Sequence, residues 1–169
     1  MDITQLILDD HHEQRRLFSI LEQIDKHDTN SLRAVWKRLA AFLEVHAETE
    51  ERIFYPQLLK VGRKAGKRTG VDDETRDAIK DHNQIRDAVA AVAKEKVGTK
   101  AWFDAVARAN EANSKHMGEE EREGLTDFRR DASLSLRHAL AVAFIAFETR
   151  NVGGVEPLDK DPKKWVATH

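Results

Sequence analysis

Long stretches of this chain repeat apolar residues at intervals of three and four, with little to interrupt them. The 169 residues include only three prolines and eight glycines. Apolar side chains at this spacing share one face of an α-helix, and no segment has the pattern of a strand. We therefore predict five helices, over residues 3–27, 31–60, 72–96, 99–123 and 131–149.

Short breaks separate these stretches. The first break, KHDTNS (26–31), offers three candidate N-caps for the second helix, Thr29, Asn30 and Ser31. Gly98 is placed to end the third helix and Thr99 to cap the fourth. The basic, glycine-containing segment KVGRKAGKRTG (60–70) is predicted to be an exposed loop.

Long helices joined by short connections pack antiparallel to their neighbours in a bundle. The sequence therefore predicts an all-α fold. We expect residues 1–125 to form an antiparallel four-helix bundle that runs up-down-up-down. Residues 126–150 add a C-terminal fifth helix outside the bundle, and residues 151–169 are expected to form an irregular tail.

Composition excludes several classes of function. There is no cysteine, which rules out disulfides and thiolate-bound metal clusters. The net charge is −2 and both signs are mixed along the chain, so we expect no nucleic-acid partner. The start, MDITQLILDD, lacks the features of a signal peptide, and the longest apolar run, ALAVAFIAF (139–147), is too short to cross a bilayer. We expect a cytoplasmic protein that does not bind membranes.

Each of the four predicted bundle helices carries a histidine on the face that should be buried. These histidines are His11, His46, His82 and His116. In the second and fourth helices a glutamate follows four residues later, Glu50 and Glu120, which is roughly one turn along the same face. The two halves also repeat, with HAETEER (46–52) matching HMGEEER (116–122).

A buried cation explains this set better than an apolar core does. An unpaired buried carboxylate costs several kcal/mol, and a bound metal ion removes that cost. Imidazole together with carboxylate suits iron, zinc or manganese. Two glutamates from facing helices can each bridge two ions, which favours a dinuclear site over two separate zinc sites.

Four segments resemble the hemerythrin-like, or HHE cation-binding, family: DHHEQRRLF (10–18), HAETEERIFYP (46–56), DHNQIRDAV (81–89) and HMGEEER (116–122). The resemblance covers roughly residues 3–125 and implies a four-helix bundle with a centre of two Fe ions. It also implies the ligands His11, His46, Glu50, His82, His116 and Glu120, with the glutamates bridging. Matching DHHEQR with DHNQIR pairs Asp10 with Asp81, which favours His11 over the solvent-facing His12.

Two departures from the family's oxygen carriers matter. Those proteins have a second histidine one turn after the histidine of the third helix, where this chain has Arg86. In the last helix they place an aspartate five residues after the histidine, whereas here Glu120 follows His116 by four. One nitrogen ligand is therefore missing, and reversible O2 carriage is not expected.

Tyr55, the only tyrosine, is a candidate to fill the missing ligand position. A regular helix would point it about 140° away from Glu50, but Pro56 predicts a distortion of the helix here, and a distortion that turns Tyr55 inward would make it a ligand. The alternative is an ordinary half-buried tyrosine.

The family resemblance implies a di-iron protein that binds or transforms a small diatomic or peroxide ligand. The enzymatic version decomposes hydrogen peroxide or scavenges another oxidant. A non-enzymatic sensor or store of iron, O2 or nitric oxide is the main alternative, and a two-zinc hydrolase is a third. No pattern identifies an electron donor. The apolar residues of the fifth helix, among them Phe144 and Ile145, either cover the bundle or form a homodimer interface.

Overall fold

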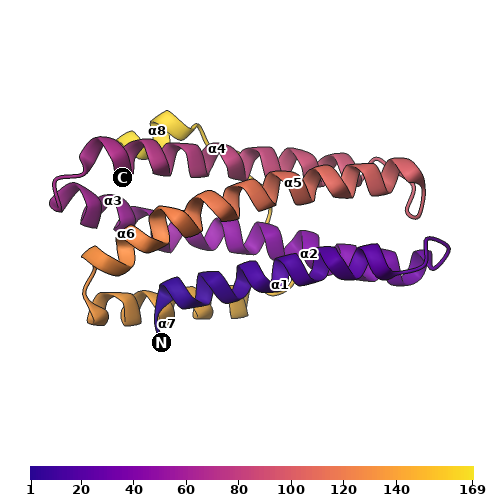
Figure 1. Ribbon diagram of the computed structural model, residues 1–169, viewed down its shortest axis with the longest axis horizontal. Coiled ribbons are helices and arrows are strands. Elements are labelled where there is room, and N and C mark those ends of the chain that lie inside the picture. Colours follow the sequence, from indigo (N-terminus) through magenta and orange to yellow (C-terminus); the bar gives the residue numbers. More distant parts are fainter.

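Four long helical rods lie side by side in the computed structural model, which describes residues 1–169 (Figure 1). The first rod is α1 (Ile3–Gln23), and the second joins α2 (Thr29–Thr49), the π-helix η1 (Glu50–Phe54) and α3 (Tyr55–Lys64). The third and fourth are α4 (Arg68–Val92) and α5 (Lys100–Arg122). The C-terminal part adds α6 (Gly124–Asp131), α7 (Leu134–Arg150) and α8 (Pro162–Thr168). The predicted all-α bundle with additional helical structure is confirmed.

Side-chain caps fix the start of several helices. Thr99 caps α5 as predicted, because its hydroxyl accepts a hydrogen bond from the backbone N–H of Trp102. The cap of α2 differs from all three predicted candidates. Asp28 holds that position, and its carboxylate accepts from the N–H of Ser31 at 3.1 Å.

Residues 60–70, which were predicted to form an exposed loop, are mostly helical, so this prediction was wrong. Helix α3 continues to Lys64 and α4 begins at Arg68, which leaves three connecting residues. Gly66 makes the turn with φ +81, a conformation that favours glycine. Gly62 has another role, because a Cβ there would lie 2.9 Å from the side chain of Val71. This glycine allows α3 and α4 to approach closely.

The apolar core is divided into two clusters. One holds Ile7, Phe54 and Ile79 towards one end of the bundle, and the other holds Leu17, Leu39 and Ile85. The predicted site histidines fall between the two clusters along their helices. His11 follows Ile7 and precedes Leu17, and His82 lies between Ile79 and Ile85. A buried polar layer thus separates two conventional hydrophobic cores.

The C-terminal part differs from prediction in two ways. The fifth helix, expected over residues 131–149, is present as α7 with Ser133 as its cap, but a further short helix, α6, occupies the start of the expected 126–150 segment. The tail expected to be irregular contains α8, which begins at Pro162 after an Asp161 cap and buries Trp165 and Val166. Seven residues give too few turns for a helical period to show in the sequence.

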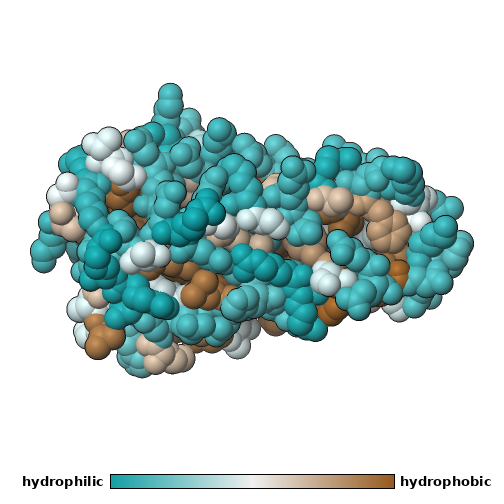
Figure 2. All heavy atoms as spheres, viewed as in Figure 1, coloured by the Kyte–Doolittle hydropathy of each residue, from teal (hydrophilic) through white to brown (hydrophobic).

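The two C-terminal helices pack on different sides of the bundle. Helix α7 lies along α1, α2 and η1, whereas α8 lies over α4 (Figure 1). Phe144 of α7 is fully buried, while Val142 and Ile145 remain 45% and 41% exposed. Helix α7 therefore covers the bundle, and the homodimer stays a prediction. Figure 2 shows a mostly hydrophilic face with scattered hydrophobic residues, and no helix is sufficiently long and apolar to cross a membrane.

Candidate metal centre

A π-helical turn shapes the second rod where the site begins. In η1 the N–H of Tyr55 bonds to the carbonyl of Glu50, five residues earlier, instead of to the residue four earlier. Such a turn brings residues five apart onto one face, where an α-helix would separate them. The Tyr55 hydroxyl consequently lies 3.3 Å from Oε2 of Glu50, to which it donates a hydrogen bond. The predicted distortion before Pro56 is present, and it turns the tyrosine inward.

Three predicted ligands form the first group. His11 from α1, His46 from α2 and Glu50 from η1 are buried, and each offers a ligand atom within 4.8 Å of the others. Nε2 of His46 lies 3.0 Å from Oε1 of Glu50. This arrangement offers two nitrogens and one oxygen to a single ion.

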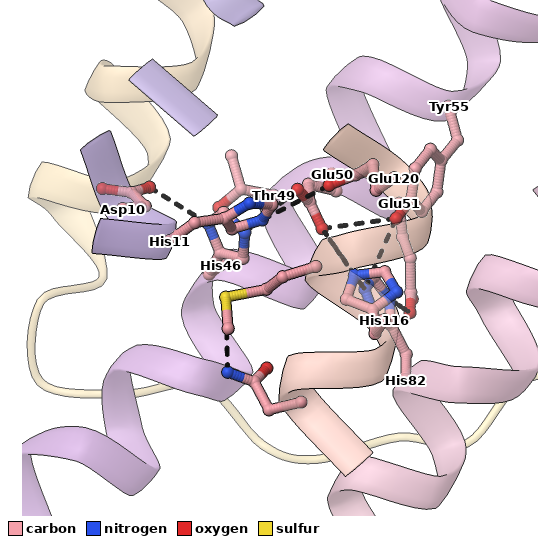
Figure 3. A network of polar contacts seen from close by, with 12 residues as sticks. Asp10, His11, His46, Thr49, Glu50, Glu51, Tyr55, His82, His116 and Glu120 are labelled. Atoms are coloured by element: carbon pink, nitrogen blue, oxygen red, sulfur yellow. Dashed lines mark hydrogen bonds and ion pairs between the residues drawn. The ribbon is translucent and has the colours of Figure 1, made fainter. Parts of the chain in front are cut away.

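The second group uses the other oxygen of the same glutamate. Oε2 of Glu50 lies 3.2 Å from Nε2 of His82 and 3.9 Å from Nε2 of His116. The two imidazole Nε2 atoms are 3.1 Å apart, and the Tyr55 hydroxyl is 3.4 Å from Nε2 of His82. Glu50 therefore lies between the two groups, with one oxygen toward each (Figure 3).

Glu120 occupies a less central place. Its Oε2 lies 3.3 Å from Nε2 of His11, and its side chain is only 4% exposed. It belongs to neither group of three ligand atoms, so the structure does not give it a position equivalent to that of Glu50. His12, by contrast, is exposed as expected.

Several buried atoms of this set lack any hydrogen-bond partner. They are His11 Nε2, His46 Nε2, Glu50 Oε1 and both carboxylate oxygens of Glu120. Buried polar atoms are normally paired, since leaving one unpaired costs about 1–3 kcal/mol. All of these atoms are good metal ligands, and a cation among them would satisfy them together. The donor set therefore fits a bound metal ion.

The electrostatics also favour positive charge. Burial would raise the pKa of Glu50, but the charge of His46 and the close approach of the imidazoles of His116, His46 and His82 hold it well below its usual range. Burial would lower the pKa of His82, but hydrogen bonds to Glu50 and Glu51 raise it to about 9. Protons on the imidazoles balance the buried carboxylates, and a metal ion can take over that role while releasing the protons.

Carboxylates hold the outer nitrogens of three of these histidines. Nδ1 of His11 lies 2.9 Å from Glu121, Nδ1 of His46 lies 3.0 Å from Asp10, and Nδ1 of His82 lies 2.8 Å from Glu51. Because a carboxylate only accepts, each Nδ1 donates and leaves Nε2 free to bind a metal. The sequence analysis assigned none of these roles. One sequence feature could have indicated them: each of these carboxylates is the immediate sequence neighbour of a predicted ligand, and it contacts a histidine that belongs to a different helix.

Arg86, which stands where the family's oxygen carriers have a second histidine, binds two carboxylates of the second rod. Its Nε lies 3.0 Å from both oxygens of Glu44, and its Nη2 lies 3.1 Å from Oε1 of Glu51. The Arg86 side chain is 5% exposed, and its single positive charge lies between these two acidic groups. It helps to hold Glu51 against His82.

Two cavities reach the histidines from opposite sides of α4. One, of about 240 Å³, is lined by Tyr55, His116 and Glu120 together with acidic residues of α4 and α5. The other, of about 330 Å³, is largely apolar and runs from His82 between α2 and α4 to residues 153–157 of the tail. Both are sized for small molecules.

Comparison with known proteins agrees with this geometry. The family model of the hemerythrin HHE cation binding domain matches residues 2–126, which confirms the resemblance carried by the four segments. No curated protein and no solved structure matches the chain. The match covers most of the chain and all of the buried histidines, so this protein belongs to the hemerythrin HHE cation-binding domain family.

Proposed function

We propose that this protein holds two Fe ions and uses them to bind or transform a small oxidant, namely O2, hydrogen peroxide or nitric oxide. The observation that carries this proposal is the position of Glu50. Its two oxygens face separate pairs of buried imidazoles, which is the arrangement that a carboxylate bridge between two ions requires. Mixed nitrogen and oxygen ligands suit iron.

The protein's residues supply a defined environment for that centre. His11 and His46 would hold one ion, His82 and His116 would hold the other, and Glu50 would join them. Glu120 would add an oxygen beside His11. Bound iron supplies reversible coordination and electron exchange with a small oxidant. The two flanking hydrophobic clusters limit the access of water to these ligands.

Tyr55 would act at the second ion. Burial, together with the negative charges of Glu120 and Glu50, raises the pKa of its phenol well above the usual value. Without a metal the hydroxyl therefore keeps its proton and donates a hydrogen bond to Glu50. A metal ion at His82 and His116 would favour phenolate, making Tyr55 a ligand in place of the missing histidine.

The acidic character of the cavity at His116 and Glu120 favours uncharged ligands over anions. Glu74, Asp77, Glu119 and Glu123 line it along with Glu120. Peroxide as H2O2, O2 and nitric oxide are uncharged and small enough to enter. The same surface would attract ferrous ions during loading.

The first test is the iron content and absorption spectrum of protein purified without chelators. We expect about two irons per chain, followed by O2 release from hydrogen peroxide or by spectral changes with nitric oxide. His46→Ala should abolish both iron binding and activity, whereas His12→Ala, an exposed neighbour of the site, should preserve them. Zinc alone, or no iron after loading, would contradict the proposal. Reversible spectral changes without turnover would identify a binding protein in place of an enzyme.

A further inference from the structure

The C-terminal segment lies outside the family match, yet it reaches the buried histidines from two directions. The family match ends at residue 126. Beyond it, the ring of Phe144 in α7 lies 6.0 Å from the ring of His46, and Trp165 in α8 lies 6.4 Å from Tyr55. The connecting tail places Lys160 beside the acidic residues of the second rod. This last contact is the polar one of the three, and it reaches His82 through Glu51.

Lys160 is fixed at its backbone. The side chain of Asn83 donates to the carbonyl of Lys160 at 2.8 Å and accepts from its N–H at 3.1 Å. Asn83 follows His82 directly on α4. The tail is therefore attached next to the histidine by two hydrogen bonds that do not involve the lysine side chain.

The ammonium of Lys160 joins two carboxylates. Its Nζ donates to Oε2 of Glu51 and, at 2.5 Å, to Oε2 of Glu48. The lysine side chain is 19% exposed and that of Glu51 only 1%. Holding a lysine so far from water is costly unless its charge is well paired. Since Asn83 and the buried Trp165 already attach the tail, anchoring alone does not explain this charge.

Glu51 passes the contact on to the metal centre. Its Oε2 accepts from Lys160, and its Oε1 lies 2.8 Å from Nδ1 of His82. Arg86 contacts the same Oε1 at 3.1 Å. Lys160 is thus the group that contacts Oε2 of Glu51, while His82 and Arg86 contact Oε1. A partner on each oxygen opposes rotation of the Glu51 carboxylate about its Cγ–Cδ bond.

We propose that Lys160 is a positioning residue of the metal centre, which acts through Glu51 to orient His82. The C-terminal tail therefore contributes to the geometry of the site. This inference rests on the proposed function insofar as His82 is a ligand. It assigns the tail a role that the family domain, which ends before it, does not contain. Loss of such an outer contact typically weakens metal binding by 10–100-fold.

The test compares Lys160→Gln, Lys160→Arg and Lys163→Gln in the full-length, iron-loaded protein. Lys163 is an exposed lysine three residues further along and serves as the matched loss of charge. We expect Lys160→Gln to release iron to a chelator about 10-fold faster and to shift the absorption bands. Lys160→Arg should restore most of the wild-type behaviour, and Lys163→Gln should match wild type. Urea unfolding of each variant checks that the fold is intact.

A double-mutant cycle tests the route through Glu51. In a Glu51→Ala background, adding Lys160→Gln should change the rate of iron release little, because the carboxylate through which Lys160 acts is already absent. Fully additive effects would overturn the proposal, as would a Lys160→Gln variant that behaves like Lys163→Gln.

A readout without metal separates this inference from the proposed function. If the wild-type protein binds no iron, the di-iron proposal fails, but Lys160 still acts on His82 in the metal-free chain. There, NMR of the imidazole N–H groups should show faster exchange of the His82 Nδ1 proton in Lys160→Gln than in Lys163→Gln. Equal exchange in the two variants would overturn the role of Lys160.

Discussion

The two halves of the metal centre resemble each other in sequence but differ in structure. His11 precedes His46 by 35 residues and His82 precedes His116 by 34, and a glutamate follows one turn after the second histidine in each half. The rods that carry these glutamates then diverge. After Glu50 the chain enters a π-helical turn, whereas after Glu120 helix α5 continues as an α-helix to Arg122.

That divergence gives the two glutamates different roles. Glu50 contacts imidazoles of both groups, while His11 is the one imidazole among the four that Glu120 contacts. The supporting carboxylates differ as well. Asp10 lies against Nδ1 of His46, but its counterpart Asp81 pairs with Lys115 at 2.7 Å instead of with His116. A repeated sequence motif therefore produces one glutamate shared by both groups of imidazoles and one peripheral glutamate.

The largest expected effect comes from removing the shared carboxylate. Glu50→Ala should lose both irons, because its two oxygens serve the two groups separately, whereas Glu120→Ala should keep at least the ion at His82 and His116. Metal analysis and the absorption spectrum measure this difference. Glu119→Ala, a more exposed neighbour paired with Lys115, is the control. Equal losses in the Glu50 and Glu120 variants would show that the halves are functionally symmetric after all.

The next effect sharpens the contrast between Asp10 and its counterpart Asp81. Asp10→Asn should weaken iron binding by about 10–100-fold, because it replaces the charged acceptor of the His46 Nδ1 proton by a neutral amide oxygen, which accepts more weakly. Asp81→Asn should change iron binding by much less, since its partner is Lys115. Competition with a chelator gives both affinities. A larger loss in Asp81→Asn than in Asp10→Asn would contradict the assignment.

Much of this architecture was predictable from the sequence, because helical period and histidine position are local signals. The four bundle helices and the burial of His11, His46, His82 and His116 follow from residues spaced three and four apart. The inward position of Tyr55 was only one of two readings, since its direction depends on a π-helical turn that no local pattern specifies. Pro56 indicated that the helix would be distorted but not which way.

Contacts between distant segments were beyond the sequence. The pairing of Glu121 with His11 joins residues 110 positions apart, and that of Lys160 with Glu51 joins residues 109 apart. Nothing in a single sequence relates such residues. Helix α8 was missed for a related reason, because its stability comes from burying Trp165 and Val166 against the bundle and not from its own short period.

A smaller effect is expected at Tyr55, which is present at the second group and absent from the first. Tyr55→Phe should retain both irons, since His82, His116 and Glu50 remain, but it should remove any phenolate-to-iron absorption band. The absorption spectrum of the oxidised protein makes the comparison, with metal content measured on the same sample. An unchanged visible spectrum would show that Tyr55 acts only as a hydrogen-bond donor to Glu50.

The smallest effect concerns the acidic cavity beside the second group. Burial, with the negative charges of Glu123, Asp127 and Glu120, raises the pKa of Glu74 from 4.5 to about 8. Between these values the folded chain holds a proton that the unfolded chain has lost, so stability falls as the pH rises through that range. Glutamine resembles the protonated form and has no such dependence.

Glu74→Gln should therefore stabilise the metal-free protein by about 2 kcal/mol at pH 8.5 and leave it unchanged at pH 4, after allowance for partial exposure to solvent. Urea unfolding across this pH range measures the difference. Asp77→Asn removes an exposed carboxylate from the same cavity and is the matched control. If both variants lose the pH dependence equally, the penalty belongs to the whole acidic wall. If Glu74→Gln alone removes the pH dependence, the cost of the acidic wall is concentrated in one half-buried carboxylate, and a cation entering the cavity would relieve it there first.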